Sequence, residues 1–287
     1  ERFVTAEEHY LPPDNYQLHP GPILAHRTSP TNMGLALLAN LSAYDFGFIS
    51  CANLLKRCEN TLATMASLPR FYGHFYNWYD TTTLASLAPR YVSTVDSGNL
   101  AGHLVTLRGG LLELPDNPIL SAQTLQGLRD TLSVVIDATP EMQRKRLAPI
   151  QNLLIKPVGT LLATQAAPGA IAQVLFQLAE RSASLIASID VSLEPNAGEW
   201  SIALDQQIRD AVSEIDSLMP WLRLAVPSPT ESFGVVELLN GAATLSSIAV
   251  LPAQLTPLVD AALRMPITAA QSTWLSAIQG HIIAASS

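Results

Sequence analysis

The residues best suited to chemistry lie between Gly73 and Gly102, in the run GHFYNWYDTTTLASLAPRYVSTVDSGNLAG. This segment holds five aromatic residues, two aspartates and one histidine among small polar residues. Aromatic faces stack on the apolar CH faces of sugar rings, while amides and carboxylates hydrogen-bond to hydroxyl groups. The composition of the segment therefore indicates a carbohydrate-binding cleft.

The two aspartates of this segment, Asp80 and Asp96, each have a structural and a functional interpretation. Asp96 stands just before a predicted helix, where its carboxylate would cap the free N–H groups of the first turn. Asp80 is followed by Thr81 and Thr82, which suits an Asx turn, but its aromatic neighbours favour contact with a ligand. A glycosidase needs two carboxyl groups on either side of the scissile bond, and Asp80 and Asp96 are the candidates for this catalytic pair.

Four further side chains are candidates for the same site. His74 and His103 suit either a packed core position or a ligand contact. His26 and Arg27 precede the first predicted helix. The guanidinium of Arg27 would either clamp a carboxylate such as Asp96 or offer its donors to a sugar.

Charge and composition exclude several classes of function. The formal net charge is −8 and no stripe of Lys and Arg is present, which argues against a nucleic-acid surface. No phosphate-binding glycine loop and no His/Cys set with metal-ligand spacing is found, so we expect no cofactor and no metal. No apolar run reaches the roughly 18 residues that span a bilayer, so we expect no membrane span within the chain.

The first 114 residues contain the elements that would position these side chains. Residues 1–30 are predicted to be extended because prolines interrupt them. Ser29 and Pro30 form a helix start, since serine caps helices and proline suits the first helical position. A second helix is predicted after Ser50, residues 69–95 read as a long ordered loop, and a third helix is predicted to start near Asp96–Gly98. The helices are marked by apolar stripes: Met33, Leu37, Leu41; Leu54, Cys58, Leu62, Met65; Leu100, Leu104, Leu107, Leu111, Leu114.

The remainder, 115–287, is rich in Ala and Leu and shows further stripes at helical spacing. Strand alternation is nearly absent, so the predicted fold is all-α, a multi-helix toroid that is incomplete in this chain. We divide the chain into an extended segment (1–30), a motif-bearing helical part (31–114) and the Ala/Leu-rich remainder (115–287), the last two within one domain.

Four ordered blocks in the first part resemble the cyclic β-1,2-glucan synthases, which are long bacterial inner-membrane enzymes. The blocks are 11–17 (LPPDNYQ), 25–35 (AHRTSPTNMGL), 73–81 (GHFYNWYDT) and 91–104 (YVSTVDSGNLAGHL). They resemble the opening of the central, glucoamylase-like region of that family, over about residues 10–112. The resemblance implies an (α/α)-barrel that binds β-1,2-glucan and cyclises it by transglycosylation.

The resemblance also implies a site, a partner and a location. The chain would be part of a glycoside hydrolase or transglycosylase whose main catalytic Glu residues follow in a later segment. Its ligand would be a β-glucan, its partner the rest of a larger polypeptide, and its location the cytoplasmic side of the bacterial inner membrane, with this fragment itself soluble. The implied substrate-binding residues are His26, Arg27, His74, Tyr76, Asn77, Trp78, Tyr79, Asp80, Asp96, Ser97 and Asn99.

Two alternatives stay open at this stage. In the first, the chain is a complete glycoside hydrolase that uses Asp80 and Asp96 as acid and base. In the second, it is a non-catalytic helical interaction module, and the aromatic motifs shape a core or a docking surface.

Overall fold

The structure is a computed structural model that describes residues 2–154, 167–186, 195–228 and 234–285. Helices make up most of these residues, and each described strand is two residues long, so the predicted all-α fold class is confirmed. The chain divides into two compact units. Unit 1 comprises residues 1–45 and 51–113, and unit 2 comprises residues 46–50 and 114–287. The toroidal arrangement stays a prediction.

Unit 1 is built on three helices: α1 (Pro30–Asp45), α2 (Cys51–Ser67) and α3 (Thr94–Glu113). Helix α1 starts at Pro30, as predicted from the sequence. Its N-cap is Ser29, whose hydroxyl accepts a hydrogen bond from the backbone N–H of Asn32 at 3.2 Å. The second helix also begins where Ser50 predicts. In α2, however, Thr61 lies in the buried face in place of the predicted Leu62, which is exposed.

Helices α1 and α3 approach each other closely at two glycines. A Cβ added to Gly34 would lie 2.4 Å from Nδ1 of His103, and one added to Gly110 would lie 2.6 Å from a methyl group of Leu41. These positions therefore allow the two helix backbones to pack more tightly than side chains would permit. His103 is half-buried and packs against α1, which suits the first of its two interpretations, a packed position.

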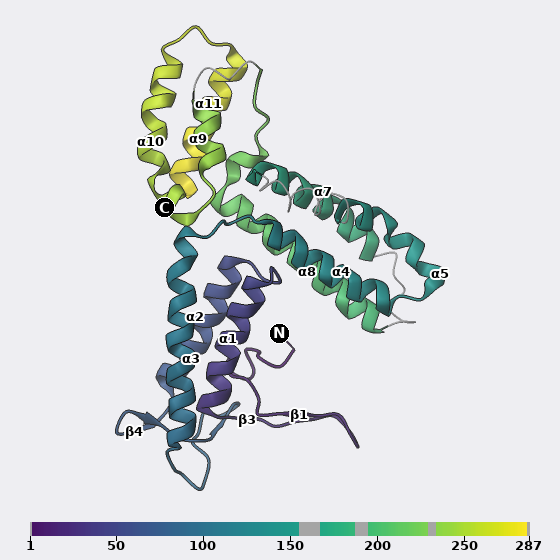
Figure 1. Ribbon diagram of the computed structural model, residues 1–287, viewed down its shortest axis with the longest axis vertical. Coiled ribbons are helices and arrows are strands. Elements are labelled where there is room, and N and C mark those ends of the chain that lie inside the picture. The colour runs from purple at the N-terminus through teal and green to yellow at the C-terminus, as the bar shows by residue number, and fades with distance from the viewer. Residues whose placement is uncertain (1, 155–166, 187–194, 229–233, 286–287) are drawn as a thin grey trace. The chain divides into compact units, whose positions relative to one another are not determined.

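The strands of unit 1 lie at the end where α1 and α3 begin and α2 ends (Figure 1). We call this the strand end. Three antiparallel pairs form there, in part from the segment 69–95 that was predicted to be a loop. The pairs are β1 (Tyr16–Gln17) with β2 (Ile23–Leu24), β3 (Arg27–Thr28) with β6 (Tyr79–Asp80), and β4 (Arg70–Phe71) with β5 (His74–Phe75).

Among the described residues of unit 2 the named elements are all helices, and an isolated β-bridge joins Pro118 to Thr244. The helices are η1 (Leu114–Asp116), α4 (Ala122–Ala138), α5 (Glu141–Arg144), η2 (Lys145–Leu147), α7 (Pro168–Ile186), α8 (Pro195–Leu218), η3 (Pro220–Arg223), α9 (Val235–Gly241), α10 (Leu245–Leu263) and α11 (Ala269–Ala285).

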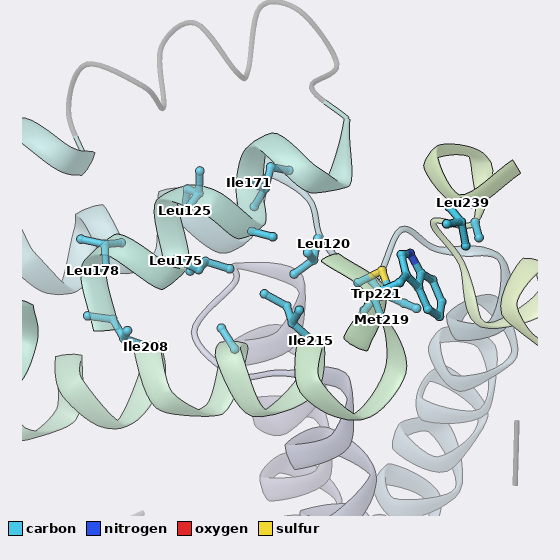
Figure 2. Packing of buried hydrophobic residues seen from close by; sticks show 14 of the residues in the cluster. Leu120, Leu125, Ile171, Leu175, Leu178, Ile208, Ile215, Met219, Trp221 and Leu239 are labelled. Carbon is cyan, nitrogen blue, oxygen red and sulfur yellow. The ribbon is translucent and has the colours of Figure 1, made fainter. Parts of the chain in front are cut away.

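The core of unit 2 is one hydrophobic cluster. Figure 2 shows Leu125 of α4, Leu175 of α7 and Ile208 of α8 among the side chains that meet there. The stripe predicted over 125–135 is buried as expected, because residues spaced by three or four lie on one face of a helix.

One described helix, α10, is long and apolar enough to cross a membrane by length and composition alone. The expectation of no membrane span within the chain stays a prediction for α10. Its buried residues Ile248, Leu251 and Leu255 belong to the core of unit 2, and a core helix passes the same test.

Candidate functional site

Asp96 lies at the centre of a hydrogen-bond network at the strand end. It is not the N-cap predicted from the sequence, because α3 begins two residues earlier, at Thr94. The cap is Ser93, whose hydroxyl accepts from the Asp96 backbone N–H at 3.1 Å and donates to Oδ2 of Asp96 at 2.6 Å. Asp96 therefore stands in the first turn of α3, where the helix dipole favours a negative charge.

The buried amide of Asn77 joins this carboxylate to two aromatic residues. Its nitrogen donates to Oδ2 of Asp96, and its oxygen accepts from the Tyr91 hydroxyl and from Nε1 of Trp78, each at 2.8 Å. This orientation is assigned because it gives every donor an acceptor, whereas the reverse orientation sets the amide oxygen against the carboxylate. Asn77 thus holds Tyr91, Trp78 and Asp96 together.

The same carboxylate connects the beginnings of α1 and α3. Partial burial acts to raise the pKa of Asp96, but hydrogen bonds from Ser93, Thr31 and Ser29 outweigh it and hold the pKa below its usual range. Nearby, Asn99 donates to the Thr31 hydroxyl at 3.1 Å, which makes a second α3–α1 contact. Ser97 donates to the Ser93 carbonyl at 2.7 Å, within the first turn of α3. This part of the motif therefore fastens one helix to the other.

Asp80 forms the Asx turn that its sequence predicts. Its Oδ1 accepts from the backbone N–H of Thr82 (2.9 Å), from the Thr82 hydroxyl (2.7 Å) and from the backbone N–H of Thr83 (2.8 Å). These hydrogen bonds lower the pKa of Asp80, and the one from the Thr82 side chain contributes most to that shift. Asp80 is therefore a turn residue whose carboxylate is already engaged.

Arg27 clamps a carboxylate, but the partner is Asp14 and not Asp96. Its Nε and Nη2 donate to Oδ2 of Asp14 at 3.1 and 2.9 Å. The guanidinium also lies over the Trp78 ring, 4.6 Å from its centroid, in a cation–π contact. Because β3 pairs with β6, Arg27 is fixed beside the aromatic segment. Arg27 is therefore held in place as a support for Trp78.

His26 meets a buried carboxylate, Glu8, that the sequence analysis left out. Nδ1 of His26 lies 2.7 Å from Oε1 of Glu8, and the Thr81 hydroxyl donates to the other oxygen of this carboxylate. Glu8 has no motif of its own and stands near the start of the sequence, so only its position in the fold reveals it. These contacts fasten the N-terminal segment to the residues that flank β3 and β6.

The aromatic residues expected to stack on a ligand differ in exposure. Tyr79 is fully buried, its hydroxyl donates to the Pro69 carbonyl and accepts from the Tyr76 N–H, and burial raises its pKa. A buried ring offers no face to a ligand, so the stacking role expected for Tyr79 is not compatible with this structure. Trp78 and Tyr76 are half-buried, and the ring of His74 is exposed.

A pocket of about 410 Å³ lies beside this network and is lined by Phe71, His74, Tyr76, Arg90, Tyr91 and Val92. His74 and Tyr76 were predicted site residues. Phe71, Arg90 and Tyr91 were missed, although Tyr91 opens one of the four sequence blocks. Neither the exposure of the Tyr91 ring nor the hydrogen bond from its hydroxyl to Asn77 could be recognised from the sequence.

The arrangement is suited to binding rather than to acid–base catalysis. The general acid of a glycosidase needs a raised pKa, whereas the pKa values of Asp80 and Asp96 are both lowered. No group of three or more metal-ligating side chains occurs within the residues that the structure describes. The pair Asp80 and Asp96 thus lacks the electrostatics that the complete-hydrolase alternative requires.

The lowered pKa of Asp96 predicts a change in acid stability. A carboxylate with a depressed pKa stabilises the folded state above its unfolded pKa of about 3.9, and this stabilisation is lost as the pH falls through the folded pKa. Asp96→Asn should therefore lower the unfolding free energy at pH 7. Between about pH 4 and pH 2, the unfolding free energy of this variant should fall by less than that of the unmodified chain. Urea unfolding at several pH values measures both effects. If the unfolding free energies of the two proteins fell in parallel as the pH was lowered, this role of Asp96 would be contradicted.

Comparisons with known proteins add to this geometry. No family model matches the chain. Over 157 residues it is 45% identical to cyclic beta-(1,2)-glucan synthase NdvB of Rhizobium meliloti (strain 1021), which covers 54% of this chain and 6% of that protein. The chain thus corresponds to a small fraction of the length of this relative. Over that part of its sequence, the resemblance to the cyclic β-1,2-glucan synthases is confirmed.

Proposed function

We propose that unit 1 supplies part of the glucan-binding surface of a larger carbohydrate-active enzyme, one that makes or cyclises β-1,2-glucan by transglycosylation. The similarity to a cyclic β-1,2-glucan synthase supports the substrate class and the larger polypeptide. The observation that carries the proposal is the aromatic pocket at the strand end. Under this proposal the whole enzyme lies at the bacterial inner membrane, with this region on the cytoplasmic side.

The pocket offers the groups that a glucan requires. The rings of Phe71 and Tyr91 are 51% and 46% exposed, so each leaves a face open for stacking on a sugar ring. Arg90 and His74 border the same space and can hydrogen-bond to hydroxyl groups. The volume of about 410 Å³ lies within the range of small-molecule pockets and would hold part of a longer chain.

The other motif residues act from behind this surface. Asn77 fixes the Tyr91 hydroxyl, and Trp78 is fixed by Asn77 on one side and by Arg27 on the other. A side chain that is already ordered loses less conformational entropy when a ligand binds. Asp96 and Asn99 in turn set the α1–α3 contact, so they position the binding residues. The main catalytic carboxylates would then belong to other parts of the enzyme.

Tyr91→Ala is the direct test of this pocket. It should weaken the binding of a linear β-1,2-glucan oligosaccharide about tenfold, which corresponds to about 1.4 kcal/mol, because it removes the stacking face. Tyr91→Phe keeps the ring and loses the hydrogen bond to Asn77, so it should retain most of the affinity. Isothermal titration calorimetry measures these affinities.

Phe46→Ala is the matched control, since Phe46 is 59% exposed and does not line the pocket. It should bind the oligosaccharide as the unmodified chain does. Equal binding by Tyr91→Ala, or the same loss in Phe46→Ala, would reject this pocket. Absence of any glucan binding would favour the helical interaction module, for which the full burial of Tyr79 is the supporting observation.

A further inference from the structure

Helix α3 has a buried side and an exposed side along its whole length. It packs against α1, and its buried residues, Leu100 and Leu107, are two helical turns apart. The side that points away from them is exposed, and we call its residues the outer stripe: Val95, Gly98, Gly102, Val105, Gly109 and Leu112. Val95 and Val105 are 70% and 71% exposed, so the apolar side chains of the stripe are open to solvent.

The spacing of the outer stripe is that of a coiled-coil seam. Its residues follow one another at alternating spacings of three and four, which is the a and d pattern of a heptad repeat. The stripe consists of valine, leucine and glycine, and it runs for about 25 Å along the helix at 1.5 Å per residue. Such a seam is typical of a helix that lies side by side with one other helix.

Within the described part of unit 1, packing does not require the glycines of the outer stripe. A Cβ added at Gly98, Gly102 or Gly109 would meet nothing within 4 Å, in contrast to Gly34 and Gly110. Glycine inside a helix weakens it, because glycine loses more conformational freedom on folding than other residues do. A second helix that approaches the stripe closely would use the room that these glycines leave.

The exposed residues beside the stripe include two of opposite charge, Arg108 and Glu113. Among the residues that the structure describes, neither side chain makes a hydrogen bond or an ion pair. Glu113 lies near another carboxylate, Asp45: burial raises the pKa of Asp45, and the negative charge of Glu113 raises it further. A cation brought by a partner would relieve this repulsion.

The positions of these two charges favour one direction of pairing. They are five residues apart and correspond to positions g and e of the heptad. In a parallel, in-register pair, position g of one helix faces the following position e of the other, so Arg108 of each copy would meet the partner's Glu113. Two-fold symmetry makes this contact twice. In an antiparallel pair of the same stripe, Arg108 would lie level with the partner's Asn99 instead.

We infer that two copies of this chain pair in parallel along the outer stripe of α3. Val95, Val105 and Leu112 of one copy pack against the same residues of the other, and the contacts between Arg108 and Glu113 set the direction. The stripe is a single helix wide, so it buries less area than a standard stable interface, and we expect a weak dimer with a Kd of about 100 μM. At a few micromolar the chain would be mostly monomeric, and its folding is measured there without the dimer.

Sedimentation equilibrium of the 287-residue chain, from about 5 to about 500 μM, measures this dimer. Val105→Glu should raise the Kd at least about tenfold, because it places two carboxylates in the seam. Since Val105 is 71% exposed, the monomer accommodates this substitution. Val250→Glu is the matched control: the same substitution at an exposed valine of α10, outside the stripe, should leave the Kd unchanged.

Charge reversal tests the direction of the pair. Arg108→Glu should raise the Kd about tenfold at low salt, since it sets like charges opposite each other twice. Adding Glu113→Arg to that variant should restore the Kd to within about twofold, because the same pairs form with exchanged signs. A monomer throughout the range, an unchanged Kd in Val105→Glu, an equal loss in Val250→Glu, or no recovery in the double variant would overturn the inference. Tyr91→Ala does not alter the outer stripe, so the glucan proposal succeeds or fails separately.

Discussion

Gly34→Ala is expected to destabilise unit 1 by about 2 kcal/mol. The added Cβ would lie 2.4 Å from Nδ1 of His103 and 2.9 Å from its Cβ and Cγ, which is closer than Cβ atoms are found to other atoms. A rotation of the His103 side chain moves its ring but not its Cβ, so the 2.9 Å contact with that Cβ remains, and α1 and α3 must move apart. Overpacking costs about 1–3 kcal/mol, and we expect the upper end here because the contact is so short. The better helix propensity of alanine offsets about 1 kcal/mol of this cost, which leaves about 2 kcal/mol.

Gly102→Ala is the matched control for this prediction. Gly102 lies in the middle of α3, and a Cβ added there would meet nothing within 4 Å. The same substitution should therefore stabilise the chain by about 0.5–1 kcal/mol through helix propensity alone. Amide hydrogen exchange in α1 and α3 reports the stability of unit 1 directly. A loss in both variants, or a gain in both, would contradict the close approach of these helices.

The contact between Gly34 and His103 gives a physical reason for the presence of these two residues in the sequence blocks. Gly34 lies in the block 25–35 and His103 in the block 91–104, and the structure brings them into contact. The sequence analysis offered a packed core position for His103 but could not name its partner, because helix spacing says which side of a helix is buried and not what covers it. The partner lies 69 residues away in the numbering, on another helix.

The helices could be predicted from the sequence because their signals are local. Ser29 and Pro30 mark the start of α1, and apolar spacing marks the buried sides of α1 and α4. The start of α3 was placed two residues too late, since both Ser93 and Asp96 are good caps and the sequence does not decide between them. The short strands were missed because two residues give no alternation to detect.

The candidate site was predictable only in part, since its contacts join distant segments. The Asx turn of Asp80 was found because its partners, Thr82 and Thr83, are neighbours in sequence. The partner of Arg27 was not found, because Asp14 and Asp96 are equally available in sequence and only the fold places Asp14 within reach. Exposure also depends on the fold, so the buried Tyr79 and the exposed Tyr91 could not be told apart.

Asn77→Asp is expected to have the largest effect at the site, a loss of about 3 kcal/mol at neutral pH, in the range found when a buried charge has no partner. The new carboxylate would replace an amide nitrogen that donates to Oδ2 of Asp96 at 2.8 Å, so two negative charges would meet in a partly buried space. Tyr91 and Trp78 could still donate to one of its oxygens. The loss therefore comes from the contact with Asp96.

The pH dependence of this loss distinguishes charge repulsion from a simple loss of packing. Two carboxylates that share a site raise the pKa of one of them, so the folded variant takes up a proton more readily than its unfolded chain. A raised folded pKa means that stability returns as the pH falls through that value, so the difference between variant and unmodified chain should shrink between about pH 7 and pH 4.5. Asn77→Ala removes the same amide without adding charge, and its loss should stay constant over this range. Urea unfolding of both variants across that range decides the matter, because a pH-independent loss in Asn77→Asp would mean that Asn77 does not face Asp96 through its nitrogen.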